Sequence, residues 1–414
     1  MSDRRETDVV VIGGGPAGLS AAAAAAEAGA KVVLVDRNRQ LGGILNQCIH
    51  DGFGLQAFGE VLTGPEFAAR VAARALEAGI EVHTDTMVTD LTSSRELVCT
   101  TSGERYPLRA EAVVLAMGCR ERTRGMLRIP GTRPAGVYTA GAAQWLTNMA
   151  DVRVGRRVFI LGSGDVGLIM ARRLVWEGAE VAGVAELLPY PSGLPRNVSQ
   201  CLEEYDIPLY LAHSVTCIHG RDRVEAVTVT RFDERRLPIA GTEFEVACDT
   251  LLLSVGLIPE NELSRNADVV LDPMTGGAVV NERYMTSVDG IFSCGNVLHI
   301  HDLADRAAEE GDRAGRCAAR YALGPSTSRR EELRIDAGEG IRYVVPQRAE
   351  RSAEELLVSL RISEPADRCT AVVTAGDRVI AEESLRHGHP STMVQMRLRS
   401  RGGIDADRLE VRMR

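Results

Sequence analysis

Two glycine-rich segments carry the residue types and spacing that bind the pyrophosphate of a dinucleotide. The first reads Gly13-x-Gly15-x-x-Gly18, and an acid, Asp36, lies 23 residues after its first glycine. Gly13 permits a tight turn, Gly15 lets backbone N–H groups approach a pyrophosphate, and Gly18 lets the helix pack on the strand. The helix N-terminus adds a favourable dipole, and Asp36 is placed to accept hydrogen bonds from ribose hydroxyls. The segment predicts a dinucleotide site.

The second segment has the same design. It reads Gly162-x-Gly164-x-x-Gly167 and is followed by Glu186, 24 residues after its first glycine. An acid at the end of the second strand repels the 2′-phosphate of NADP, so this segment favours NAD(H).

The elements that must position these glycines recur as a repeat. Asp8–Ile12 is a continuous apolar run, which is typical of a central parallel strand buried on both faces. An Ala-rich helix to about Ala28 and a strand over Lys31–Val35 follow the first turn, and the same strand, turn, helix and strand recur over 157–186. The repeat predicts an α/β protein with two Rossmann-like domains.

The order of the motifs resembles that of flavoproteins with two dinucleotide-binding domains, in which an inserted NAD domain splits the FAD domain. Four further segments carry the resemblance: Leu41-Gly42-Gly43, Leu115–Gly118, Leu253–Gly256 and Gly290–Asn296. The resemblance implies that the first turn binds FAD through Gly13, Gly15, Pro16, Ala17, Gly18, Asp36, Arg37, Gly42, Gly43, Val88, Ala116, Gly118, Gly295 and Asn296. It implies that the second turn binds NAD(H) through Gly162, Gly164, Asp165, Val166, Gly167, Glu186 and Gly256. Asn296 departs from the family, which more usually has Asp there.

Three stretches are similar to a narrower group. Gly118–Arg124, Gly162–Asp165 and Cys294–Asp302 resemble the flavoprotein encoded beside a glycerol-3-phosphate-dehydrogenase-like protein. Related subunits occur in opine oxidase, D-hydroxyproline dehydrogenase and hydrogen cyanide synthase. The resemblance implies an oligomeric, multi-component dehydrogenase with a partner dehydrogenase subunit. No cysteine cluster in this chain suits an iron–sulfur centre, so any such centre is expected on a partner.

The expected domain organisation follows from the motifs and from a change in the hydrophobic pattern of the sequence near residue 326. We expect the FAD domain at 1–125 and 285–325, the NAD domain at 126–284, and a small antiparallel β-domain at 326–414. The last region consists of short alternating runs, and Ala375-Gly376-Asp377 is typical of a hairpin turn.

The sequence alone leaves open which residues perform catalysis. Cys48 is either a peroxidatic thiol or, as we favour, a small side chain packed under the cofactor. His50 and His301 are weak candidates for general acid–base catalysis, with structural hydrogen bonding as the alternative. His299-x-His301 has no clear third ligand nearby, so we predict no metal site.

The cysteine pattern leads us to expect that the chain is not a disulfide reductase. The nine cysteines form no C-x-x-C pair, and only Cys48 follows the first FAD segments closely. One thiol cannot store two electrons as an intramolecular disulfide. Scattered thiols in an odd number also fit a reducing cytoplasm.

Composition narrows the class of function further. A net charge of −9 argues against nucleic-acid binding, which requires basic patches. The N-terminus has no apolar signal segment and the chain has no apolar run of membrane-spanning length, so we expect a cytoplasmic protein that is not integral to a membrane. The leading hypothesis is hydride transfer between NAD(H) and FAD, with electrons exchanged with a partner subunit. The alternatives are a self-sufficient FAD dehydrogenase or oxidase of a small amine or 2-hydroxy acid, and a docking subunit that retains its cofactors for structural reasons.

Overall fold

The chain forms two compact units in the computed structural model, which describes residues 5–324, 331–400 and 403–414. The first unit comprises Met1–Cys119 and Pro259–Arg414, and the second comprises Arg120–Ile258. Residues 259–284, expected in the NAD domain, therefore lie in the first unit. The reason is that Asn261 donates a hydrogen bond to the Val297 carbonyl at 3.1 Å, while Val280 is buried in the first unit's core. The boundary expected at 325–326 falls outside the described residues.

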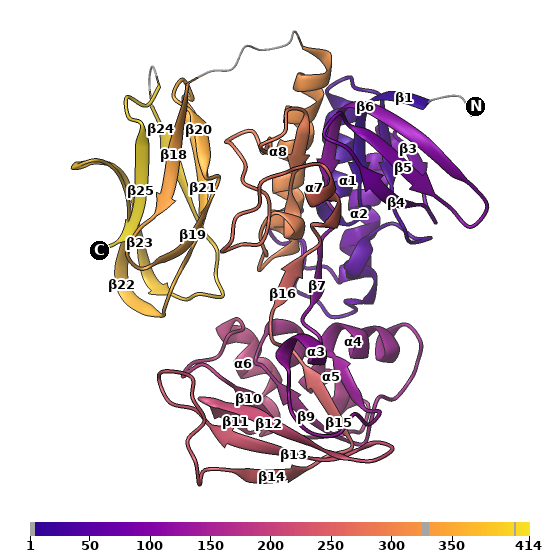
Figure 1. Ribbon diagram of the computed structural model, residues 1–414, viewed down its shortest axis with the longest axis vertical. Coiled ribbons are helices and arrows are strands. Elements are labelled where there is room, and N and C mark those ends of the chain that lie inside the picture. Colours follow the sequence, from indigo (N-terminus) through magenta and orange to yellow (C-terminus); the bar gives the residue numbers. More distant parts are fainter. Residues whose placement is uncertain (1–4, 325–330, 401–402) are drawn as a thin grey trace. The chain divides into compact units, whose positions relative to one another are not determined.

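The first unit is built on a seven-stranded sheet with the order β3-β2-β1-β6-β5-β4, and β17 also pairs with β6 (Figure 1). Val9 on β1 pairs in parallel with Val32 on β2 and with Ala112 on β6, so apolar side chains are buried on both sides of the sheet. The strands are β1 (Arg5–Ile12), β2 (Val32–Val35), β3 (Glu81–His83), β4 (Met87–Leu91), β5 (Glu96–Thr100), β6 (Arg105–Leu115) and β17 (Ile291–Ser293).

Small residues let two helices of the first unit pack very closely. An added Cβ on Gly311 would lie 2.0 Å from the Ala17 carbonyl oxygen, and one on Gly315 would lie 2.1 Å from that of Ala21. Only glycine therefore fits at these two positions of α8, where α8 crosses α1. The helices of this unit are α1 (Pro16–Glu27), η1 (Gly43–Gln47), α2 (Gly64–Glu77), α7 (Glu262–Asn266), η3 (Gly295–Val297) and α8 (Ala304–Leu323).

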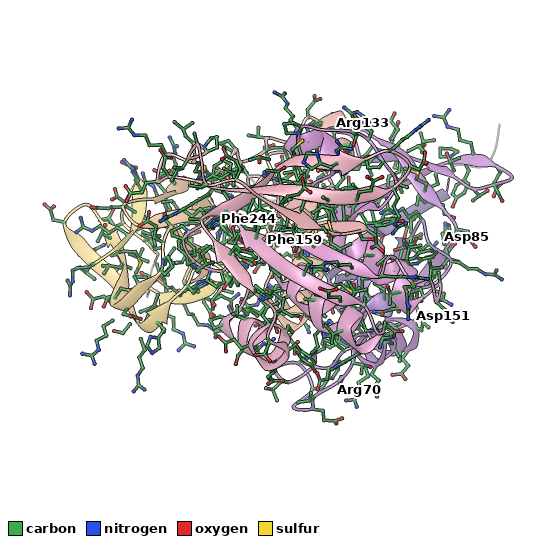
Figure 2. All side chains as sticks on the ribbon, turned by 90° about the horizontal axis from the view of Figure 1, so that it is seen from below. Arg70, Asp85, Arg133, Asp151, Phe159 and Phe244 are labelled. Atoms are coloured by element: carbon green, nitrogen blue, oxygen red, sulfur yellow. The ribbon has the colours of Figure 1, made fainter. Side chains whose placement is uncertain are left out.

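The second unit contains a five-stranded parallel sheet with the order β11-β10-β9-β15-β8 and an antiparallel sheet β12-β13-β14. Figure 2 labels Phe159 of β9 and Phe244 of β14, which contribute to the core of this unit through Tyr210. The strands are β8 (Val137–Thr139), β9 (Arg157–Leu161), β10 (Glu180–Glu186), β11 (Leu209–Leu211), β12 (His213–Gly220), β13 (Val224–Arg231), β14 (Phe244–Ala247) and β15 (Thr250–Leu253). The helices are α3 (Arg124–Leu127), α4 (Ala140–Asn148), α5 (Asp165–Trp176), α6 (Pro195–Cys201) and η2 (Glu203–Tyr205), and a short ribbon pairs β7 (Cys119–Glu121) with β16 (Leu257–Pro259).

The C-terminal part of the first unit forms two sheets, β20-β18-β25-β22-β23 and β19-β21-β24. Ala375 pairs with Arg378, which confirms the predicted hairpin turn. The pairing is antiparallel except between β18 and β25, which run parallel. The strands are β18 (Glu332–Ala337), β19 (Ile341–Val345), β20 (Arg348–Glu350), β21 (Glu355–Ile362), β22 (Ala366–Ala375), β23 (Arg378–Gly388), β24 (Val394–Arg399) and β25 (Arg408–Met413).

The predicted fold class is confirmed. The second unit has a parallel, Rossmann-like sheet, and the sheet of the first unit is parallel except where β5 pairs antiparallel with β4 and β6. Antiparallel sheets accompany them. Among the described residues, no helix has both the length and the apolar character needed to cross a bilayer.

Candidate dinucleotide sites

The first glycine turn joins β1 to α1 and packs against the end of β6. An added Cβ on Gly13 would lie 2.4 Å from the Ala116 carbonyl oxygen, and one on Gly18 would lie 1.8 Å from the Gly13 carbonyl oxygen. At Gly15, in contrast, an added Cβ meets no described atom within 4 Å. Packing therefore explains two of the three glycines, whereas Gly15 leaves open space where a pyrophosphate is expected.

Asp36 is held beside this turn. Its carboxylate accepts the Gly14 N–H at 2.5 Å and the Asn38 N–H at 2.6 Å. The following segment folds back over the turn, because the Gly42 N–H donates to the Gly14 carbonyl at 2.7 Å and an added Cβ on Gly43 would lie 3.0 Å from the Gly15 Cα. Residues predicted from two separate motifs thus lie at one place.

The remaining predicted FAD residues come from other parts of the first unit. An added Cβ on Gly295 would lie 2.6 Å from the Ala17 Cβ, so the last FAD segment contacts α1. Asn296 accepts the His301 N–H at 2.9 Å. Gly118 follows the end of β6 with a φ of +75°, a conformation that favours glycine. The other predicted positions are Pro16 in the first turn of α1, Arg37, which is exposed after Asp36, and Val88, which is buried on β4.

The second glycine turn has the same packing in the second unit. An added Cβ on Gly162 would lie 2.2 Å from the Ser254 carbonyl oxygen, and the Gly167 N–H donates to Ser254 Oγ at 3.1 Å. Gly164 is more confined than Gly15, because an added Cβ there would lie 2.9 Å from Ser254 Oγ. Asp165 and Val166 open α5. Ser254 lies within the predicted segment 253–256, which ends at Gly256, but its contact with the turn was not predicted.

Glu186 at the end of β10 is bound more extensively than Asp36. It accepts the Ser163 N–H and the Leu188 N–H, both at 3.0 Å. Two hydroxyls also donate to its Oε2: Ser163 Oγ at 2.5 Å and Ser192 Oγ at 2.8 Å. Neither serine was predicted, since Ser192 lies 29 residues beyond Ser163 and no motif spacing connects them.

Cys48 and His50 lie after η1. Burial raises the pKa of the Cys48 thiol to about 12, and the thiol donates to the Ile44 carbonyl at 3.3 Å. The Nδ1 atom of His50 lies 2.8 Å from the Asp51 carbonyl oxygen. In this arrangement Cys48 is a protonated thiol rather than a thiolate.

His299 and His301 converge on Glu310 of α8 in a buried cluster. The His299 Nε2 atom lies 2.8 Å from Glu310 Oε2, and the His301 Nε2 atom lies 3.5 Å from Glu310 Oε1. The Gly295 N–H also donates to Glu310 Oε1 at 2.7 Å. The expectation that the histidines lack a third group is therefore wrong, because α8 brings Glu310 to them. The His299 and Gly295 distances are those of hydrogen bonds, which connect α8 to the last FAD segment.

The cluster also contacts the C-terminal sheets. The ring of Tyr343 packs edge-on against His299, with 5.9 Å between ring centroids. Arg361 donates to the Ile300 carbonyl at 3.0 Å and to the Tyr343 hydroxyl at 3.1 Å. The C-terminal sheets therefore contact and support the segment that carries Gly295.

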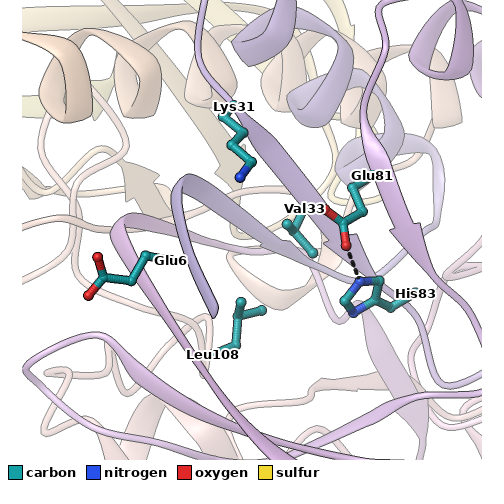
Figure 3. Close-up of a pocket in the computed structure, with 6 residues that line it drawn as sticks. All are labelled: Glu6, Lys31, Val33, Glu81, His83 and Leu108. Atoms are coloured by element: carbon teal, nitrogen blue, oxygen red, sulfur yellow. Dashed lines mark hydrogen bonds and ion pairs between the residues drawn. The ribbon is translucent and has the colours of Figure 1, made fainter. Parts of the chain in front are cut away.

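A small pocket of about 180 Å³ lies elsewhere on the first unit (Figure 3). Glu6 and Lys31, near the beginning of β1 and β2, line it together with His83, which pairs with Glu81 at 2.8 Å. Ligands of open parallel sheets bind at the carboxyl ends of the strands. The glycine turns, and not this pocket, therefore define the candidate sites.

We expect the first unit to lose stability as the pH falls from about 7. Burial lowers the pKa of His299 from 6.5, so below that pH the unfolded chain binds a proton more readily than the folded protein. Burial alone would raise the pKa of Glu310, but the facing His301 and His299 hold it well below its ordinary value of 4.5, so its contribution is lost only in stronger acid. Melting temperatures between about pH 8 and pH 4 check this. His299→Gln should flatten the profile near pH 6.5, and a profile parallel to that of the wild type would contradict the assignment.

The model of the pyridine nucleotide-disulphide oxidoreductase family matches residues 7–311 of this sequence. That range includes both glycine turns, both acids and Glu310. The chain belongs to this family. Its members' cofactors, FAD and NAD(P), match the two sites described above, although the choice between NAD and NADP is not decided by membership.

Two curated relatives belong to larger enzymes. The hydrogen cyanide synthase subunit HcnB of Pseudomonas protegens is 25% identical over 384 residues, which cover 87% of this chain and 77% of the relative. One of the subunits of opine oxidase from Agrobacterium tumefaciens is 26% identical and is matched over 76% of this chain and 65% of its own length. The crystal structure of thioredoxin reductase from T. acidophilum, at 24% identity, superposes with a TM-score of 0.61 over 77% of this chain and 98% of that one, which shows a shared fold.

These findings correct the expectation that disulfide reductases can be set aside. The family includes disulfide oxidoreductases by its own description, and a thioredoxin reductase shares the fold. Counting thiols led to that expectation, and none of the nine cysteines, all of which lie in the described ranges, is in a disulfide. The number and spacing of cysteines are not sufficient to exclude a disulfide reductase. A single thiol can exchange with a disulfide through a mixed disulfide, so an intramolecular pair is not required.

Proposed function

We propose that this chain is an FAD-dependent oxidoreductase that exchanges hydride between a nicotinamide dinucleotide and flavin, as a subunit of a multi-component dehydrogenase. The observation that carries the proposal is the pair of glycine turns, one in each compact unit. Each turn has an acid held by two backbone N–H groups, Asp36 in one and Glu186 in the other. Such an exchange requires two dinucleotide sites.

Each site has residues for a distinct task. The open space over Gly15 and the N-terminus of α1 fit a pyrophosphate, and Asp36 fits a ribose. In the second unit, the turn at Gly164 and the Glu186 carboxylate fit the corresponding parts of NAD(H). Bound flavin would supply the hydride chemistry, while the protein supplies position and electrostatics.

Partner subunits are supported by two further observations. Both curated relatives described above are named as subunits. In addition, one segment of the first unit exposes five large apolar side chains, and such a concentration is typical of an interaction surface. They are Ile44, Ile49, Leu55, Phe58 and Val61. We propose an oligomeric assembly with two partners, a dehydrogenase of the glycerol-3-phosphate-dehydrogenase-like type and an iron–sulfur protein. The cytoplasmic location of this assembly stays a prediction.

The purified chain tests the proposal directly. Under anaerobic conditions NADH should bleach the flavin absorbance band, because the proposed exchange reduces the flavin. Bleaching by a 2-hydroxy acid or an amine, without any response to NADH, would contradict the proposal in favour of a self-sufficient dehydrogenase. Turnover of NADH with a small disulfide such as cystine, without any partner protein, would instead indicate a disulfide reductase.

A further inference from the structure

The carboxylate of Glu186 is held by two serine hydroxyls in addition to its backbone bonds. Ser163 Oγ and Ser192 Oγ lie 2.5 and 2.8 Å from the same oxygen, Glu186 Oε2. The serines also contact each other, because the Ser192 N–H donates to Ser163 Oγ at 2.8 Å. Glu186 has only 5% of its surface exposed. We call Ser163 and Ser192 the serine clamp.

The loop that carries Ser192 is fastened to the turn at a second point. Asp165, the first residue of α5, accepts the Leu194 N–H at 2.8 Å and the Asn197 side-chain amide at 2.7 Å. Gly193 lies between Ser192 and Leu194, and an added Cβ there would lie 2.7 Å from the Ser163 carbonyl oxygen. The clamp is therefore part of a loop that packs directly on the glycine turn.

The FAD side of the same chain provides an internal comparison. Asp36 and Glu186 accept the same pair of backbone bonds, from the residue after the first glycine and from the residue two positions beyond the acid. No described serine or threonine hydroxyl donates to Asp36. Glutamate is longer by one methylene and has one more rotatable bond. The two serine hydroxyls therefore restrain only Glu186, the acid whose side chain has more freedom to move.

This arrangement affects which dinucleotide can bind. Glu186 Oε2 already accepts three hydrogen bonds, whereas Oε1 accepts only one described bond, from Leu188, and so retains capacity for a ribose hydroxyl. A 2′-phosphate would meet this fixed negative charge. An unrestrained glutamate relieves such repulsion by rotating away, but the charge-assisted bonds of the clamp oppose that rotation.

We propose that Ser163 and Ser192 are positioning residues that set the preference for NAD(H) over NADP(H) by fixing the Glu186 carboxylate. The inference rests on the proposed use of a nicotinamide dinucleotide. It goes beyond the acid itself, because it assigns part of the selectivity to two hydroxyls that act through the acid.

The experiment compares NADH and NADPH in flavin reduction by the FAD-loaded full chain. In the double variant S163A/S192A, the ratio of kcat/KM for NADH over NADPH should fall by about tenfold, which equals roughly 1.4 kcal/mol. The fall should come mainly from KM, and Ser192→Thr, which keeps the hydroxyl, should retain the wild-type ratio. Ser199→Ala, at an exposed serine on α6, is the matched control and should change nothing. An unchanged ratio in the double variant, with NADH still active, overturns the inference and leaves the proposed function intact.

A binding measurement separates the two proposals in the other direction. Calorimetric titration of wild type and double variant with NAD⁺ and with NADP⁺ reports the selectivity without any electron transfer. If neither reduced cofactor bleaches the wild-type flavin, the proposed hydride exchange fails. A wild-type preference for NAD⁺ that disappears in the double variant would still support the clamp, and a preference that persists there would overturn it.

Discussion

Gly15→Val should yield a folded protein that no longer retains FAD. An added Cβ at Gly15 meets no described atom within 4 Å, so the fold can accommodate a side chain. The branched methyl groups of valine would fill the space that backbone N–H groups need for contact with a pyrophosphate. We expect FAD affinity to fall at least about a hundredfold, which corresponds to roughly 3 kcal/mol. The flavin content of the purified variant and titration with FAD measure the effect.

A second glycine provides the matched control. Gly103 also has open space around an added Cβ and has no positive φ, and it lies outside the predicted site, between β5 and β6. Gly103→Val should therefore keep its flavin and its melting temperature. Gly18→Val is unsuitable, because its Cβ would collide with the Gly13 carbonyl oxygen and unfold the turn. A yellow Gly15→Val protein with normal FAD affinity would show that the pyrophosphate does not lie over this turn.

Local sequence was sufficient to predict the two turns because each depends on contiguous residues. Gly13 and Gly162 have φ values of +108° and +92°, as the strand-to-helix turn requires. Asp36 directly follows β2 and Glu186 is the last residue of β10, and each accepts the N–H of the residue after the first glycine. Parallel pairing of neighbouring strands brings their ends together, so spacing along the chain predicted proximity in space.

The parts that were not predicted depend on contacts between distant segments. Ser192 reaches Glu186 only because its loop folds back over the turn, and nothing in the sequence distinguishes it from other loop serines. Glu310 lies in a helix rich in charged residues, where adjacent Glu309 is exposed and Glu310 is buried. Helical periodicity alone does not reveal which of two neighbouring glutamates faces two histidines on another segment. The exclusion of disulfide reductases failed for a different reason, since it considered thiols and not the fold.

Glu310→Gln should destabilise the first unit strongly. The substitution keeps the shape of the side chain but removes the charge that faces His299 and His301 in a buried environment. Glutamine has one acceptor oxygen in place of two, so at least one of the buried N–H groups that donate to Glu310 loses its acceptor, which typically costs about 1–3 kcal/mol. Thermal unfolding monitored by flavin fluorescence should show the loss, because Glu310 also accepts the Gly295 N–H in the last FAD segment.

Glu309→Gln is the control that isolates burial, since the two glutamates are neighbours on α8. Glu309 pairs with Arg313 at 2.6 Å, but its side chain is 51% exposed. Exposed helical pairs contribute only about 0.3–0.5 kcal/mol, so this variant should melt close to the wild type. Equal melting temperatures for the two variants would mean that the Glu310 cluster is energetically neutral. A much lower melting temperature for Glu310→Gln than for Glu309→Gln, with release of flavin at a lower temperature, would support a link between α8 and the FAD segment. The Gly295–Glu310 hydrogen bond is the contact that joins this segment to α8.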